Sequence, residues 1–212
     1  MGNRSSSSKK TRGYSKRRVA IKEEKQYFLI VCEGTKTEPN YFKSFPVPKN
    51  VVISVFGTAK NTIGVVEEAI ELKENDDYDQ VWCVFDRDSF PKQNFNQAIE
   101  KAKRENIKVA YSNEAFEIWY LLHFDYRDTK MSRTDYKKAL TNKMRQAKLL
   151  DSKGKYEKND SGMYRKLKNR QTSAIKNAER LLDGYHPANP EKDNPSTTVH
   201  LLVEQLNRFV SQ

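Results

Sequence analysis

Two apolar runs, each followed directly by acidic residues, constrain this chain more than any other feature of its sequence. The run at 27–32 leads to Glu33, and the run at 81–85 leads to Asp86 and Asp88. Such runs are typical of buried strands, and the carboxyl ends of parallel strands meet at one edge of a sheet, where ligands usually bind. Close carboxylates repel one another unless a cation lies between them, and their oxygens suit Mg²⁺ or Mn²⁺. We therefore predict a divalent-metal site for phosphoryl transfer, with Glu33, Asp86 and Asp88 as its ligands.

The first half of the chain alternates short apolar strands with helices. This alternation predicts an α/β fold with a four-stranded parallel sheet and right-handed crossovers. The predicted strands are 27–32, 51–56, 79–85 and 107–111. One predicted helix begins near Lys36 or Thr37, and two others cover 62–73 and 94–105.

The second half shows no convincing strand and reads as helical. A short apolar helix is predicted at 116–122, basic helices at 132–150 and 163–183, and an amphipathic helix from about Thr197 with Ser196 as its N-cap. We therefore expect a disordered basic arm at 1–25, an α/β core at 26–125 and a basic helical extension packed on that core at 126–212.

The net charge of +11 is unevenly distributed along the chain. Residues 19–129 hold fourteen basic and nineteen acidic residues, whereas residues 130–170 hold fourteen basic and four acidic ones. A protein that holds a polyanion against metal-binding carboxylates needs such a division, so we expect contact with nucleic acid. A solvated lysine-rich surface is the alternative. The candidate nucleic-acid-binding residues are Lys36, Arg87, His123, Lys137, Lys138, Arg145, Arg165 and Arg170.

The segment 112–124 follows the fourth predicted strand, so it begins at the same sheet edge. Glu117 lies there within an otherwise apolar stretch, where the cost of burying a carboxylate must be offset by a partner such as a metal or an arginine. We predict that Glu117 belongs to the catalytic site; a simple helix-start acid is the alternative. Glu38 has the same two interpretations. His123 is a candidate for phosphate contact or proton transfer, and a packed core histidine is the alternative.

Cysteine usage and hydropathy indicate a cytoplasmic protein. Cys32 and Cys83 both lie inside apolar strand runs, where we expect reduced, buried thiols and neither a disulfide nor a zinc site. No apolar run approaches the roughly 20 residues that span a bilayer, and the N-terminus lacks an apolar signal region.

The stretches CEGTKTE at 32–38, FDRD at 85–88 and SNEAFEIWYLLHF at 112–124 together resemble the RloB-like family. The stretch NPSTTV at 194–199 adds a fourth match, and the resemblance covers essentially everything from residue 26 onward. It implies a Toprim-type fold, in which a Glu-Gly motif follows the first strand and an Asp-x-Asp motif follows the third. Toprim domains serve topoisomerases, primases and nucleases and use Mg²⁺ at those carboxylates.

The resemblance also implies a role in phage defence, because RloB-like proteins are encoded near type I restriction-modification genes. Partners would then be nucleic acid and other subunits of a defence or restriction system. The position that is usually Pro in the third motif is Glu114 here, so no role passes to Glu114, whereas one passes to Glu117. No tyrosine stands out as a topoisomerase nucleophile, so hydrolysis suits the chain better than strand passage.

Three functions fit these observations. The first is a metal-dependent nuclease, in which Asp86 and Asp88 hold the metal and Glu33 is a ligand or general base. The second is a non-catalytic nucleic-acid-binding subunit, which would gain nothing from acidic residues near phosphates. The third is a haloacid-dehalogenase-like phosphatase with Asp86 as nucleophile, although the Asp-x-Asp motif here follows the third strand and not the first. DNA and RNA, including tRNA, fit the nuclease equally.

Overall fold

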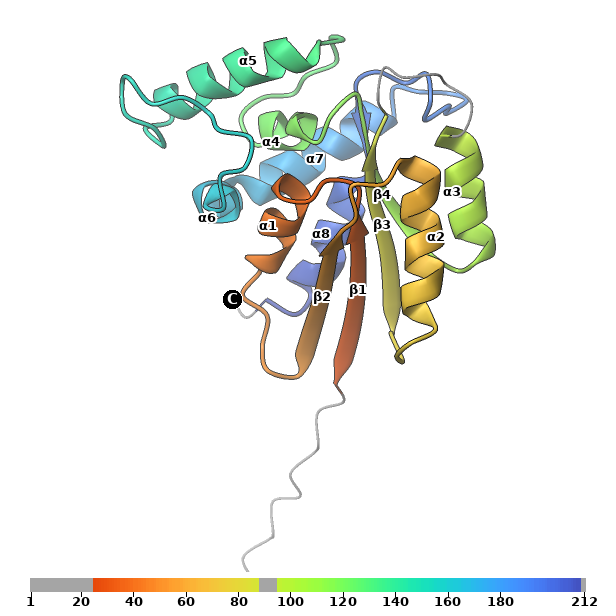
Figure 1. The fold of residues 1–212 in the computed structure, drawn as a ribbon. Helices are drawn as coiled ribbons and strands as arrows, with labels where there is room; N and C mark the ends of the chain where they lie inside the picture. Colours follow the sequence, from red (N-terminus) through yellow and green to blue (C-terminus); the bar gives the residue numbers. More distant parts are fainter. Residues whose placement is uncertain (1–24, 88–94, 211–212) are drawn as a thin grey trace, which may run out of the picture.

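The computed structural model describes residues 25–87 and 95–210, so Asp88 and nearly all of the predicted basic arm lie outside the described residues. The sheet has the strand order β2-β1-β3-β4-β5 (Figure 1). Its four long strands are β1 (Gln26–Cys32), β2 (Val51–Gly57), β3 (Gln80–Asp86) and β4 (Lys108–Asn113). They are parallel, which confirms the predicted α/β class.

The prediction of a four-stranded sheet was incomplete, because a fifth strand, β5 (Ser196–Thr197), pairs antiparallel with the end of β4. The prediction of Ser196 as a helix N-cap was wrong: its hydroxyl donates to the carbonyl of Asp193, and the last helix begins later, with Thr198 as its N-cap. A strand of two residues is too short to produce the alternation by which strands are recognised.

Helices cover both faces of the sheet, as in other parallel sheets (Figure 1). The helices α2 (Thr62–Lys73) and α3 (Phe95–Arg104) pack on one face, where Leu29 and Val31 of β1 are buried. Alternate residues of β1, such as Phe28 and Ile30, point to the other face, which α1 (Thr37–Lys43), α4 (Glu117–Leu122), α7 (Gln171–Leu182) and α8 (Val199–Asn207) cover.

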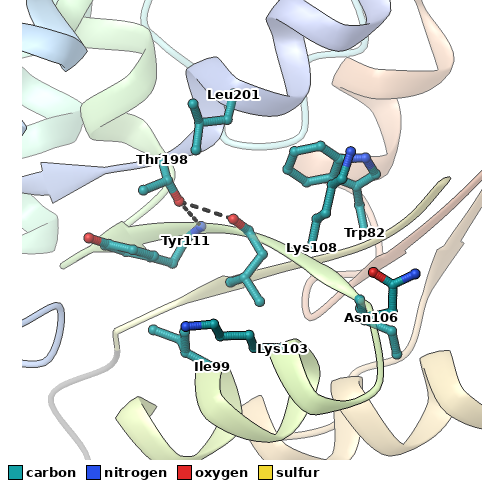
Figure 2. Close-up of a pocket in the computed structure, with 10 residues that line it drawn as sticks. Trp82, Ile99, Lys103, Asn106, Lys108, Tyr111, Thr198 and Leu201 are labelled. Carbon is teal, nitrogen blue, oxygen red and sulfur yellow. Dashed lines mark hydrogen bonds between the residues drawn. The ribbon is translucent and has the colours of Figure 1, made fainter.

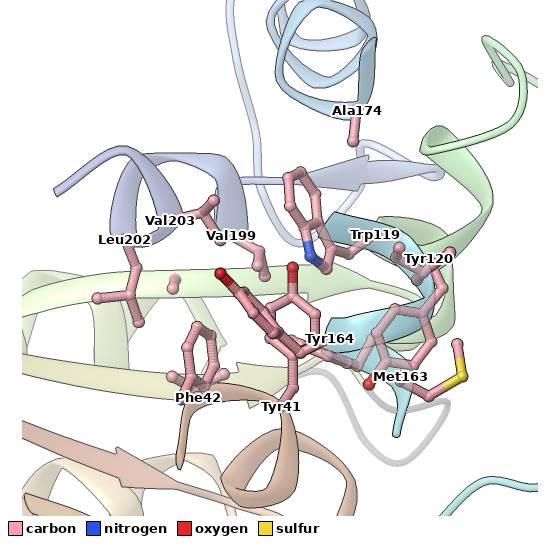
Figure 3. Packing of buried hydrophobic residues seen from close by; sticks show 14 of the residues in the cluster. Tyr41, Phe42, Trp119, Tyr120, Met163, Tyr164, Ala174, Val199, Leu202 and Val203 are labelled. Atoms are coloured by element: carbon pink, nitrogen blue, oxygen red, sulfur yellow. The ribbon is translucent and has the colours of Figure 1, made fainter. Parts of the chain in front are cut away.

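The larger apolar cluster includes the helical half of the chain. Figure 3 shows Tyr41 of α1 among Trp119, Tyr120 and Tyr164, and the ring centroids of Tyr41 and Tyr120 lie 5.6 Å apart. The Tyr41 hydroxyl accepts a hydrogen bond of 3.2 Å from the amide of Gln171 on α7. Aromatic packing and a buried hydrogen bond thus hold the helical half against α1, which covers this face of the sheet.

The two long basic helices predicted from the sequence are shorter or interrupted. The helix α5 (Arg133–Gln146) begins with a capping box formed by Ser132 and Asp135 and stops near Lys148, whose φ of 56° is left-handed. The predicted helix at 163–183 consists of α6 (Met163–Leu167), a 3₁₀ turn and then α7. No helix within the described residues is long and apolar enough to cross a membrane.

The segment before α8 completes the edge of β4 (Figure 2). Tyr111 donates its backbone N–H to the Thr198 hydroxyl at 2.9 Å, and this hydroxyl donates to the carbonyl of Val109 at 3.2 Å. The Thr198 hydroxyl thereby satisfies two backbone groups of β4 that a neighbouring strand would otherwise pair. Beside it, Trp82 and Leu201 line a hollow of about 430 Å³, which lies toward the amino-terminal end of β4.

Candidate functional site

Glu33 lies at the point where three strands meet, directly after β1. Its backbone N–H donates to the carbonyl of Val84 on β3, and its carbonyl accepts from the N–H of Ala59, which follows β2. The backbone N–H of Asp86 then donates to Glu33 Oε2 at 2.9 Å. The structure therefore brings Glu33 and Asp86 to one edge of the sheet, where the sequence placed them.

A third carboxylate, that of Glu38, packs onto the turn after β1. Glu38 is 5% exposed, and a Cβ atom at Gly34 would lie 2.1 Å from Glu38 Oε2, so only glycine allows this approach. Within the described part of the chain, Glu38 Oε2 is buried and has no hydrogen-bond partner. A buried oxygen without a partner requires an explanation, and a bound ligand is one.

Glu117, the first residue of α4, supplies a fourth carboxylate. It is 6% exposed, so it is shielded from bulk water, and its Oε1 accepts a hydrogen bond of 3.3 Å from the Tyr156 hydroxyl. Its charge acts on Asp86 and Glu38, whose pKa values it raises. Glu117 thus belongs to the same group of carboxylates.

Burial and mutual repulsion raise the pKa values of Asp86, Glu38 and Glu33 and so favour their protonated forms. Burial raises the pKa of Asp86 well above its usual range, and the charges of Glu38 and Glu117 raise it further. Burial is also the main cause of the raised pKa values of Glu38 and Glu33. We call Glu33, Glu38, Asp86 and Glu117 the carboxylate cluster. A cation placed between its members would relieve their repulsion.

Two cationic side chains from the basic residues 130–170 lie near the carboxylate cluster. Arg133 Nη2 lies 3.7 Å from Asp86 Oδ2, and its charge lowers the pKa of Asp86. The charge of Lys158 lowers the pKa of Glu38, and the carbonyl of Lys158 accepts a hydrogen bond of 2.9 Å from the Thr37 hydroxyl. Neither role could be predicted from the sequence, because neither residue follows a strand or belongs to a motif.

The cluster has the donor chemistry of a divalent-metal site. All of its donors are carboxylate oxygens, which Mg²⁺ and Mn²⁺ prefer, and Glu38 Oε2 lacks a partner. However, in the described ranges no three His, Cys, Asp or Glu side chains are grouped so that they could hold a metal ion. Asp88 lies outside these ranges, so the ligand set Glu33, Asp86 and Asp88 stays a prediction.

Most of the predicted nucleic-acid-binding residues lie at the surface. Lys36 is exposed between Glu33 and Glu38, and Arg165 is exposed on α6. Arg170 is exposed and lies over the ring of Phe124, at 5.4 Å from its centroid. Arg87 is half-buried, and its Nε donates to the carbonyl of Glu191 at 3.2 Å. The remaining three, Lys137, Lys138 and Arg145, line a surface groove of about 350 Å³ along α5 together with Lys155.

His123 is the exception. It is 1% exposed, packs edge-on against Trp119 and forms a hydrogen bond of 2.9 Å through Nδ1 with the Trp119 carbonyl. Burial lowers the pKa of His123 to about 4, so the ring is neutral at pH 7. The structure places His123 in the core and away from any surface that a phosphate could reach.

The thiols of Cys32 and Cys83 are buried and free, as predicted. No curated protein and no solved structure matches this chain. One family model, described as RloB-like protein, matches residues 28–206 and therefore includes every member of the carboxylate cluster. The chain belongs to the RloB-like protein family.

Proposed function

We propose that this protein is a divalent-metal-dependent nuclease that hydrolyses phosphodiester bonds of nucleic acid, in a phage-defence setting with other defence subunits. The carboxylate cluster is the observation that carries this proposal. Four acids, one directly after β1 and the others from α1, β3 and α4, lie together although burial and repulsion raise the pKa values of three of them. Such an arrangement lowers the stability of a fold, and strongly shifted pKa values of this kind are typical of catalytic and ligand-binding sites.

Glu33 and Asp86 would hold the cation, with Asp88 as the further ligand predicted from the sequence. A bound Mg²⁺ or Mn²⁺ would supply charge stabilisation to the phosphate oxygens and a more acidic bound water. Glu33 is fixed by the N–H of Asp86, and Glu117 is fixed by the Tyr156 hydroxyl, so both acids are held in position before a substrate binds. Arg133, exposed and beside Asp86, is placed to neutralise phosphate charge.

The α5 groove supports nucleic acid as the substrate. Lys137, Lys138 and Lys155 are exposed along it, and α5 begins at Arg133, which contacts the carboxylate cluster. A phosphate backbone that follows α5 would therefore lead to Asp86. The basic arm predicted at 1–25 would add sequence-independent contacts.

The direct test is to incubate the protein with plasmid DNA, single-stranded DNA and tRNA in Mg²⁺, Mn²⁺ or EDTA. We expect cleavage of at least one substrate with a divalent ion and none in EDTA. The Asp86→Asn variant should bind nucleic acid like the wild type and should not cleave it. Cleavage that survives in both EDTA and Asp86→Asn would refute the metal-dependent mechanism.

A non-catalytic binding subunit is the second candidate. It is favoured by one observation, the contact of 3.7 Å between Arg133 and Asp86, because an arginine already offsets part of the acidic charge without a metal. Tight binding of nucleic acid with no cleavage in any divalent ion would select this function.

A further inference from the structure

A second site lies next to the carboxylate cluster, at the carboxyl ends of β3 and β4. It is a polar pocket of about 320 Å³, lined by four basic or amide side chains beside Arg87 and by two acids: Asn113, Lys130, Lys192 and Asn194, and Glu114 and Glu191. In the strand register Asp86 is opposite Ser112, so Arg87 directly follows β3 and Asn113 is the last residue of β4. The pocket therefore begins one residue beyond Asp86.

Hydrogen bonds hold the wall of this pocket in place. Arg87 Nε donates to the carbonyl of Glu191 at 3.2 Å, and the amide of Asn113 donates to the carbonyl of Pro190 at 3.0 Å. The N–H of Glu191 donates in turn to the side chain of Asn96 at 3.2 Å. The link before β5 is thus tied to β3, β4 and α3, so the pocket is formed before any ligand binds.

The polar groups of the pocket match two parts of a nucleotide. Lys192 is exposed at its rim together with Lys130, and ammonium groups of this kind bind phosphate. Asn194 Oδ1 is buried and has no hydrogen-bond partner within the described residues. A side-chain amide carries both an acceptor and donors, which is what the edge of a base requires.

We propose that this pocket binds one nucleotide of a nucleic-acid strand, adjacent to the phosphate that reaches the carboxylate cluster. Lys130 and Lys192 contact the phosphate, and the amide of Asn194 contacts the base edge. This proposal rests on the proposed function in one respect, namely that the nucleotide belongs to a nucleic-acid strand. A free mononucleotide carries the same chemistry, so the test includes both.

The test measures binding to the full-length protein in EDTA, where no divalent ion supports cleavage. The probes are inorganic phosphate, the four ribonucleoside 5′-monophosphates and a fluorescent single-stranded hexanucleotide, as RNA and as DNA. Lys192→Ala removes a phosphate contact and should weaken all nucleotides alike, by about tenfold. Asn194→Ala should instead reduce the differences among the four bases, because base contacts carry specificity and phosphate contacts do not.

Lys103→Ala is the matched control, since Lys103 is exposed on α3 and lines the other pocket (Figure 2). It should change binding by less than about twofold. Melting curves identify any variant that fails to fold, and Asn194→Asp then replaces Asn194→Ala. The proposal is overturned if mononucleotides bind no better than phosphate, or if Lys192→Ala behaves like Lys103→Ala. It is also overturned if Lys192→Ala weakens the binding of free mononucleotides but not that of the hexanucleotide, because the pocket then takes no nucleotide from a strand.

The outcomes separate this site from the nuclease proposal. Nucleotide binding that depends on Lys192, in a protein that cleaves nothing, supports the pocket and defeats the nuclease. Metal-dependent cleavage without Lys192-dependent binding defeats the pocket alone.

Discussion

The backbone N–H of Asp86 donates a hydrogen bond of 2.9 Å to Oε2 of Glu33, so the acid that follows β1 is fixed at the end of β3. This bond lowers the pKa of Glu33, whereas burial, the larger effect, raises it. The main chain thereby holds a carboxylate in a place where burial disfavours its charge. Five testable consequences follow from that conflict and from the groups around it.

Asp86→Asn should stabilise the metal-free protein at neutral pH, because it removes the buried charge that Glu38 and Glu117 repel. One unit of pKa corresponds to about 1.4 kcal/mol, so we expect a gain of about 1 kcal/mol or more in the free energy of unfolding. Urea denaturation in EDTA measures it. A loss of stability would show that the contact with Arg133 outweighs the repulsion.

The gain from Asp86→Asn should depend on pH. The pKa of Asp86 is raised in the folded state. Protonated Asp86 therefore makes its full contribution to folding stability below about pH 3.9, the pKa of an aspartate in the unfolded chain. This contribution is lost as the pH rises through the folded-state pKa. The difference between wild type and variant should therefore be near zero at low pH and grow toward pH 8. Melting temperatures of both proteins across this range provide the check. A constant difference would contradict a raised pKa.

Mg²⁺ should raise the melting temperature of the wild type more at pH 8 than at pH 5. Protons compete with the metal for carboxylates whose pKa values are raised, as those of Glu33, Glu38 and Asp86 are. The control is Glu67→Gln, which removes an exposed acid on α2 that pairs with Lys101. This control should keep the full response to Mg²⁺, whereas Glu38→Gln should reduce it.

Gly34→Ala should displace the carboxylate of Glu38, because the new methyl group would lie 2.1 Å from Oε2. Overpacking of this kind typically costs about 1–3 kcal/mol, at the lower end where a side chain can move aside. In the Glu38→Ala background the same substitution should cost much less. A double-mutant cycle in denaturation experiments measures this coupling, and additive effects would show that Gly34 is needed for another reason.

Glu117→Gln should lower the rate of cleavage at least tenfold, about 1.4 kcal/mol in barrier, with little change in fold. The amide keeps the shape and can still accept from Tyr156, so only the charge is lost. The matched variant is Tyr156→Phe, which keeps the charge of Glu117 and removes the bond that positions it. Equal activity of Glu117→Gln and wild type would reduce Glu117 to a buried acid at the start of a helix.

The sequence predicted the sheet edge because its signals are local. Apolar runs identified β1 and β3, and the periodic residues of α2 gave its observed bounds, Thr62–Lys73. The acids that end those strands then had to converge, since parallel strands share a direction. The same reasoning brought Glu117 to this edge, as the residue that opens α4.

The rest depends on contacts between distant parts of the chain. The burial of Glu38 requires the missing Cβ of Gly34, and the approach of Arg133 to Asp86 requires the fold of the helical half. His123 was a candidate for phosphate contact or proton transfer because the sequence does not reveal that Trp119 packs against it in the core. Polar residues in the link before α8 gave no sign that they line a pocket.

The pairing of Thr198 with β4 has a consequence for the order in which parts of the chain fold during synthesis. Thr198 bonds to Val109, 89 positions earlier in the chain, and β5 bonds to Ser112 in the same way. Contacts of such long range form late, because the intervening chain must be made and closed first. During synthesis the end of β4 stays open until residue 198 has left the ribosome. Ribosome-bound fragments shorter than this should therefore lack the completed sheet edge, so nascent chains would carry the acids long before they carry the finished site.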